Sequence, residues 1–262
     1  MIWLVENEIL KYIKQKSWNN KLEVDGNDGK WYNISAMLNA LEKPFDELKV
    51  ATMCYEKATP GSKYWGMSVD EIIQSWRTKC SIAADRGMNL DTYIQSVLHN
   101  KPKPIIEDEV LKNKCNQFER LKMDIIEPHL DFIGSEIWLN SSKYGFRGRL
   151  DALFEVRNTD FLTIFDWKNN EEMRYNSFEK MLGPCDFLQK SDQNRYTIQL
   201  YMYKYLLEQE FNLKVKGVRI AHITQDAYNC MKPTFEYSKS FMEDVICFAI
   251  DEHNRRTKPN LS

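Results

Sequence analysis

Several familiar signatures are missing from the 262-residue sequence. No apolar run approaches the ~20 residues of a membrane span, and the N-terminus lacks the basic-then-apolar order of a signal peptide. The formal net charge is only −2, with 36 Lys and Arg against 38 Asp and Glu. Any site for a polyanion must therefore come from a local cluster of basic groups or from metal ions. We expect no membrane partner.

Metal-binding and nucleotide-binding motifs are also scarce. None of the six cysteines stands in a C-x-x-C pair, and the four histidines show no ligand spacing. The sequence contains no H-E-x-x-H, G-x-x-x-x-G-K-[ST] or G-x-G-x-x-G motif. A chain of this length buries a core without disulfides. We therefore predict free thiols and a reducing, cytoplasmic environment.

The sequence does have a high apolar content. Hydrophobic residues make up 43% and aromatic residues 13%, so most of the chain is expected to fold. Residues 1–60 read as an irregular, aromatic-rich extension packed on the core, with a turn at Asp25–Gly29. Residues 61–262 read as one domain.

Helical and alternating patterns succeed one another along that domain. Ser68 and Glu71 match a capping box at the start of a helix, in which Gly87 marks a potential break. The order of the elements predicts an α/β fold with a mixed central sheet flanked by helices. The expected elements are helices at 69–98, 106–128, 192–210 and 238–254, and strands at 135–140, 146–156, 160–169 and 213–224.

Two acids and a lysine interrupt the apolar pattern of the second and third strands. Alternation places Asp166 and Lys168 on one face of the third strand, and a hairpin would bring Asp151 near them. Converging carboxylates repel each other unless a divalent cation binds, and oxygen ligands suit Mg²⁺ or Mn²⁺. Lys168 would then orient or deprotonate a water or offset phosphate charge. For an isolated D-x-K, a salt bridge at a sheet edge is the simpler interpretation.

Two helices carry polar residues on their inward stripes. Gln199 is the polar member of an apolar stripe, where it could contact Lys168 or a phosphate, and Tyr203 is either a core residue or a stacking partner for a base. Asp91 lies on the inward stripe of the earlier helix. It could be a metal ligand, or it could form an ion pair or a cap within the helix. Arg147 and Arg149, with Lys143, could contact phosphates or could be plain surface charges.

Together these residues resemble the PD-(D/E)XK nuclease superfamily, and most closely its RecB-like branch, which includes mitochondrial genome maintenance exonuclease-like proteins of phages and large viruses. The resemblance spans roughly residues 63–210. Its first motif departs from the family, because Asp91 and Gln95 stand where the family has His and often Glu. Glu136 resembles a strand acid of this branch, although a solvent-facing role is equally open. The matching segments are "GMNLDTYIQ" (87–95), "GRLD" (148–151), "DWK" (166–168) and "QLYMY" (199–203).

The resemblance implies a restriction-endonuclease-like core and a metal-dependent DNA nuclease, with exonuclease action on single-stranded ends expected first. It implies a Mg²⁺ or Mn²⁺ site formed by Asp151, Asp166, the Trp167 carbonyl and Asp91. Lys168 and Gln199 would complete the catalytic set. It also implies a viral source, a location inside the host cell, and replication, recombination or packaging proteins as partners. An endonuclease, a decayed nucleic-acid-binding module and a structural interaction protein remain the alternatives.

Overall fold

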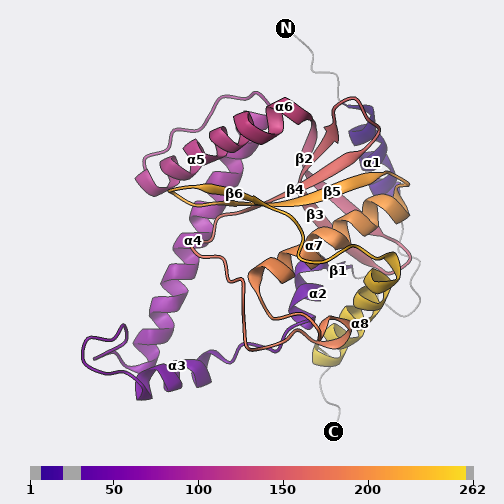
Figure 1. Cartoon of the computed structure of the whole chain (residues 1–262). Coiled ribbons are helices and arrows are strands. Elements are labelled where there is room, and N and C mark those ends of the chain that lie inside the picture. The colour runs from indigo at the N-terminus through magenta and orange to yellow at the C-terminus, as the bar shows by residue number, and fades with distance from the viewer. Residues whose placement is uncertain (1–6, 20–30, 258–262) are drawn as a thin grey trace.

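A mixed six-stranded sheet with helices on both faces forms the centre of the computed structural model (Figure 1). This architecture confirms the predicted fold class. The structure describes residues 7–19 and 31–257, so the turn expected at Asp25–Gly29 lies outside it. The helices are α1 (Glu8–Asn19), α2 (Ile34–Ala40), α3 (Glu47–Glu56), α4 (Val69–Leu98), α5 (Glu109–Leu121), α6 (Glu127–His129), α7 (Asp192–Tyr205) and α8 (Lys239–Thr257). The strands are β1 (Tyr32–Asn33), β2 (Leu130–Ser141), β3 (Phe146–Val156), β4 (Leu162–Lys168), β5 (Val215–Ile223) and β6 (Tyr228–Met231).

The strand β3 organises the sheet. β2 pairs antiparallel with β3 along its whole length, so β1 and β4 share the opposite edge of β3. β1 pairs there with residues 146–147 and β4 with residues 152–155. β5 runs parallel to β4, and the chain makes the crossover that this requires through α7. The short strand β6, which the sequence analysis did not predict, closes the far edge.

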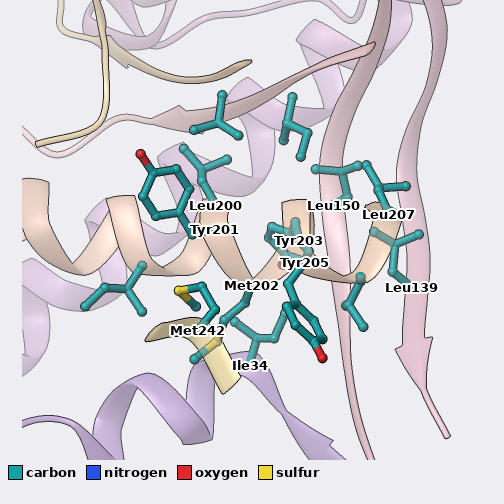
Figure 2. Packing of buried hydrophobic residues seen from close by; sticks show 14 of the residues in the cluster. Ile34, Leu139, Leu150, Leu200, Tyr201, Met202, Tyr203, Tyr205, Leu207 and Met242 are labelled. Atoms are coloured by element: carbon teal, nitrogen blue, oxygen red, sulfur yellow. The ribbon is translucent and has the colours of Figure 1, made fainter. Parts of the chain in front are cut away.

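Two hydrophobic clusters cover the two faces of the sheet. One cluster joins α1, α2, α7 and α8 to the sheet, and Figure 2 shows Leu150 of β3 close to Leu139 and Leu207 within it. The other cluster joins α4 and α5 to Phe154, Phe165 and neighbouring strand residues. The strand β4, buried from Leu162 to Trp167, contributes alternate residues to both clusters, as expected for a central strand.

The helix α4 begins as predicted and then runs without interruption. Ser68 accepts a hydrogen bond from the Glu71 backbone, and the Glu71 side chain accepts one from Ser68, which completes the capping box. The break considered at Gly87 does not occur. A Cβ atom there would lie 2.9 Å from Nδ2 of Asn169, so this glycine allows the segment after β4 to approach the helix. The first half of α4, with α3 beside it, extends away from the sheet (Figure 1).

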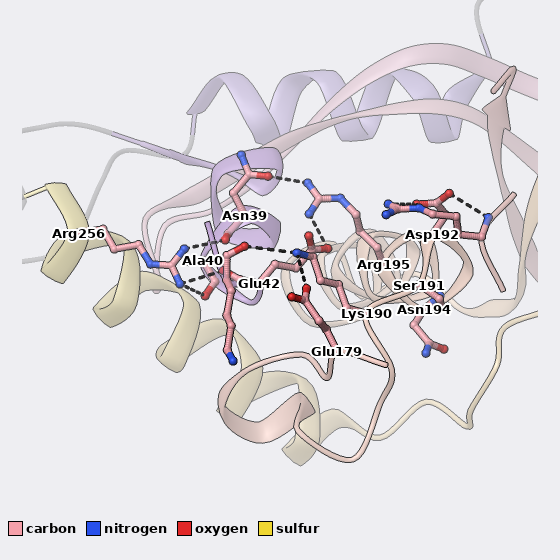
Figure 3. A network of polar contacts seen from close by, with 12 residues as sticks. Asn39, Ala40, Glu42, Glu179, Lys190, Ser191, Asp192, Asn194, Arg195 and Arg256 are labelled. Atoms are coloured by element: carbon pink, nitrogen blue, oxygen red, sulfur yellow. Dashed lines mark hydrogen bonds and ion pairs between the residues drawn. The ribbon is translucent and has the colours of Figure 1, made fainter. Parts of the chain in front are cut away.

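The described part of the first sixty residues, 7–19 and 31–60, is largely helical and not irregular as expected. α1 packs on β2, α2 packs between α7 and α8, and α3 lies on α4. Arg256 donates to the backbone oxygens of Asn39, Ala40 and Glu42 at the end of α2, where the last carbonyl groups of a helix need partners (Figure 3). Arg195 of α7 binds the side chains of Asn39 and Glu42 in the same network. Long-range contacts thus hold these helices, whose local signals are weak.

Other boundaries differ modestly from the expected ones. The helix predicted at 106–128 begins at Glu109, passes through a π-helical turn at Lys122–Ile126 and ends at His129, beyond Pro128. The helix predicted at 192–210 ends in a second π-helical turn at Leu206–Glu210. All six cysteines are free thiols. Within residues 7–19 and 31–257, no helix combines the length and apolar character that membrane crossing requires.

Candidate active site

The candidate site lies where β3 and β4 separate. Their antiparallel ladder ends at the pair Ala152–Phe165, and one further step of that register sets Asp151 opposite Asp166. In the described chain, residues 148–151 have no strand neighbour on this edge of β3, because β1 pairs only with residues 146–147. The hairpin therefore brings the two predicted acids to the point where β4 stops pairing with β3 and the edge of β3 becomes unpaired.

The backbone is irregular at the same level. Leu150 and Leu153 belong to the cluster under α7, whereas Ala152 belongs to the cluster under α4 and α5, so the side-chain alternation of β3 changes at Asp151. On β2, Glu136 falls between the pairs Ser135–Ala152 and Ile137–Leu150 and has φ 55°. A positive φ is unfavourable for glutamate, and strained residues of this kind cluster at functional sites.

Asp166, Lys168 and Gln199 form a contact triangle between β4 and α7. The Lys168 Nζ atom lies 2.6 Å from Asp166 Oδ2. That oxygen nevertheless lacks a hydrogen-bond partner with suitable angles among the described residues, so the contact is an ion pair without good hydrogen-bond direction. Gln199 donates to Asp166 Oδ1 across 3.3 Å, and its Oε1 lies 3.5 Å from Lys168 Nζ. Asp166 is fully buried, and the other two are partly buried.

The charges of the site perturb one another. Burial and the neighbouring Asp166 raise the pKa of Asp151, against the opposing effects of Lys168 and a 2.9 Å hydrogen bond from the Trp167 N–H. Burial lowers the pKa of Lys168, but Asp166 and Asp151 raise it by more. Lys168 is therefore held as an ammonium ion between carboxylates.

Asp91 approaches the same region from α4. Its pKa is raised to about 6, mainly by burial and then by Glu136 and Asp166, against the lowering effects of Lys168 and Arg149. Four acids, from α4, β2, β3 and β4, thus share an environment with two cations. An excess of carboxylates of this kind favours the binding of a cation.

The oxygen atoms present fit a small divalent cation. Mg²⁺ is commonly bound by one or two carboxylates and keeps several waters. Asp151 and Asp166 supply two carboxylates, and the buried Oδ2 of Asp166 lies beside the Lys168 ammonium without a hydrogen-bond partner among the described residues. Within the described ranges, no group of three or more His, Cys, Asp or Glu side chains is arranged to hold a metal. A ligand role for Asp91 therefore stays a prediction.

The glycine of the GRLD segment has a packing role. A Cβ atom on Gly148 would lie 2.5 Å from Cδ1 of Ile34 and 2.7 Å from Cε1 of Tyr203. The Tyr203 hydroxyl donates to the Arg149 backbone oxygen across 2.7 Å, on the edge of β3 that β4 leaves open. Tyr203 is only 4% exposed, so its ring is not accessible to a base. It supports β3 from α7 instead.

The structure adds contacts that the sequence analysis did not identify. Arg149 forms a 2.7 Å ion pair with Glu136, which ties a predicted phosphate contact to an acid of the site. The Tyr196 ring lies 4.5 Å from Lys168 Nζ. The sequence could have indicated this contact, because Tyr196 lies three residues before Gln199 on the same face of the helix. The Glu136 contact had no local signal, because it depends on the register of β2 against β3.

No family model and no curated protein matches the chain. Among solved structures, the chain is similar to one described as a "Putative exonuclease" from Eubacterium rectale, with 10% sequence identity and a TM-score of 0.45. That match covers 99% of this chain and 90% of the other. A second similar structure is that of SSO0001, with 12% identity, a TM-score of 0.36 and coverage of 96% and 88%. Similarities this low do not carry a functional inference, so function is inferred below from the geometry of the site.

Proposed function

We propose that the protein is a metal-dependent nuclease that hydrolyses phosphodiester bonds of DNA. The observation that carries this proposal is the convergence of Asp151 and Asp166 at the separation of β3 and β4, with Lys168 2.6 Å from Asp166. The site combines the buried Asp166 with the half-buried Asp151 and Lys168 at an irregular stretch of backbone, and charged groups that perturb one another in this way cluster at functional sites. This combination favours a catalytic site over a salt bridge at a sheet edge.

Asp151, Asp166 and the Trp167 carbonyl would hold Mg²⁺ or Mn²⁺, with Asp91 as a further ligand. The metal would supply Lewis-acid polarisation of a phosphate oxygen. Lys168 has three donors and no acceptor, so its ammonium group orients a water or offsets negative charge on the phosphate. Gln199 contacts both Asp166 and Lys168 and thereby holds the lysine in position. Arg149, which pairs with Glu136 and lies two residues along β3 from Asp151, would contact a phosphate next to the one that is cleaved.

Exonuclease action on single-stranded DNA ends is the proposed mode, on the strength of the motif resemblance. Endonuclease action is the second candidate within the same chemistry. A binding module without catalysis is the third, and the departures at Asp91 and Gln95 favour it.

Digestion of end-labelled linear and closed circular DNA, each with Mg²⁺, Mn²⁺ or EDTA, distinguishes these modes. Cleavage of linear DNA alone, dependent on metal, is the expected result. Cleavage of circles would identify an endonuclease. Binding without cleavage under every metal condition would refute the proposed nuclease.

Substitution of the acids tests the site itself. Asp151→Asn and Asp166→Asn should each abolish cleavage, because each removes one of two carboxylates in a site with few ligands. Asp160→Asn is the matched control, since Asp160 is an exposed acid that pairs with Lys214 at the turn between the same strands. A folded Asp166→Asn protein that cleaves DNA at the rate of the control would remove these residues from the active site.

A further inference from the structure

The strand β2 presents a tryptophan to the surface of the described chain. Trp138 is 51% exposed, although its chain neighbours Ile137 and Leu139 are buried. Among the described residues, its ring lies against Arg147, whose guanidinium carbon is 5.4 Å from the ring centroid. A cation–π pair at an exposed site contributes little to folding. Tryptophan and arginine are the residue types most enriched where proteins bind a partner, so the pair is a candidate recognition site.

This tryptophan adjoins the candidate active site. The register of β2 and β3 sets Trp138 directly opposite Arg149, and Arg149 contacts Glu136. Asp151 lies two residues farther along β3, or roughly 7 Å at the usual strand rise. A strand of substrate held at the two acids would therefore pass the indole ring within the length of a nucleotide or two.

The surface around the ring is concave and carries positive charge. A groove of about 600 Å³ is lined by Lys14, His99, Ser135, Glu136, Trp138 and Arg147. Lys14 and Arg147 supply charge that is complementary to a phosphodiester backbone, and the indole supplies a flat apolar face. Charge and apolar face together fit a single nucleic-acid strand better than an apolar helix of a protein partner.

From these contacts we infer that Trp138 and Arg147 form a stacking site for one unpaired base of the DNA substrate. The inference rests on the proposed function, because DNA is the proposed ligand. A base within a duplex is already stacked on both sides and has no free face for the indole. In a single strand the flat faces of the bases are accessible, and every base has such a face. This contact therefore selects unpaired DNA without regard to sequence. Trp138 thus takes the base-stacking role that the sequence suggested for Tyr203, whose ring is buried.

Binding in EDTA tests the inference without cleavage. The assay measures the anisotropy of a short labelled single-stranded oligonucleotide and of a blunt duplex. Trp138→Ala should weaken binding of the single strand by roughly 5- to 150-fold, the range for loss of one stacked base. Trp138→Phe should retain most of the affinity, and duplex binding should change little. Arg147→Gln should lower the salt dependence by about 0.7 in the log–log slope.

The matched control is Trp65→Ala. Trp65 is 56% exposed and precedes α4, away from β2. Its removal should leave single-strand affinity unchanged. Equal single-strand affinities for Trp138→Ala and Trp65→Ala would overturn the inference, as would an equal loss of affinity for single strand and duplex.

Failure of the stacking site is distinguishable from failure of the nuclease. Normal metal-dependent cleavage by Trp138→Ala, with an unchanged KM for single strands, would support the proposed nuclease activity and refute the stacking site. Binding that depends on Trp138, in a protein that cleaves nothing with either metal, refutes the nuclease and supports the stacking site.

Discussion

A single added methyl group at Gly148 should test how α7 supports the site. In Gly148→Ala the new Cβ would meet Ile34 at 2.5 Å and Tyr203 at 2.7 Å. Both neighbours are buried, and Tyr203 is further held by its hydrogen bond to Arg149. Neither side chain can move aside without a shift of α2 or α7.

The expected loss of stability follows from this geometry. Overpacking of a core costs about 1–3 kcal/mol, while the smaller entropy of the unfolded alanine chain offsets about 0.4–1 kcal/mol. Contacts as short as 2.5 and 2.7 Å with two buried side chains correspond to the upper part of this cost, about 2–3 kcal/mol, so an offset of about 1 kcal/mol leaves a net loss in the free energy of unfolding of about 1–2 kcal/mol. For a chain of this size that corresponds to a fall in Tm of roughly 2–8 °C.

Thermal unfolding in EDTA, followed by circular dichroism, measures this loss. Ile34→Val on the Gly148→Ala background removes the Cδ1 atom that the new methyl meets. It should recover part of the loss, although Ile34→Val alone costs about 0.5–1.5 kcal/mol. Gly217→Ala is the control, because the nearest atom to its Cβ would be Arg219 Nη1, the end of a long side chain, at 3.2 Å, and the next would lie at an ordinary contact distance of 3.8 Å.

Two results would refute the packing explanation. One is a Tm of Gly148→Ala equal to that of the wild type or of Gly217→Ala. The other is strict additivity of Gly148→Ala and Ile34→Val, since residues in contact should be coupled.

Two further predictions concern the charged groups. The pKa of Asp91, raised to about 6 by burial and by Glu136, favours the protonated folded state, so this residue's contribution to stability is present below pH ~4 and is lost as pH rises through 6. Asp91→Asn should therefore raise the Tm of the metal-free protein at pH 7.5 but not at pH 4, and a Tm difference independent of pH would contradict this. Lys168→Ala and Lys168→Gln should lower single-turnover cleavage about 100- to 1000-fold with little change in DNA affinity. A loss of affinity at an unchanged rate would make Lys168 only a phosphate anchor.

The sequence alone determined the features that depend on short-range chemistry. The capping box at Ser68 and Glu71 defined the start of α4, because both groups lie within one helical turn. The β3–β4 hairpin followed from alternation and a four-residue turn, and that hairpin is enough to bring Asp151 opposite Asp166. Gln199 was identifiable as a polar residue on an apolar helix stripe, and it does contact Lys168.

Tertiary structure decided what depends on contacts between distant segments. The positive φ of Glu136 and its ion pair with Arg149 arise from the register of two strands, which no local pattern encodes. Gly148 appeared to be a motif residue, and only the approach of α2 and α7 shows that its missing side chain makes room for Tyr203. The exposure of Trp138 likewise depends on which part of the sheet the helices leave uncovered. Local sequence sets conformational preferences within a few residues, whereas burial and side-chain partners are set by packing across the whole chain.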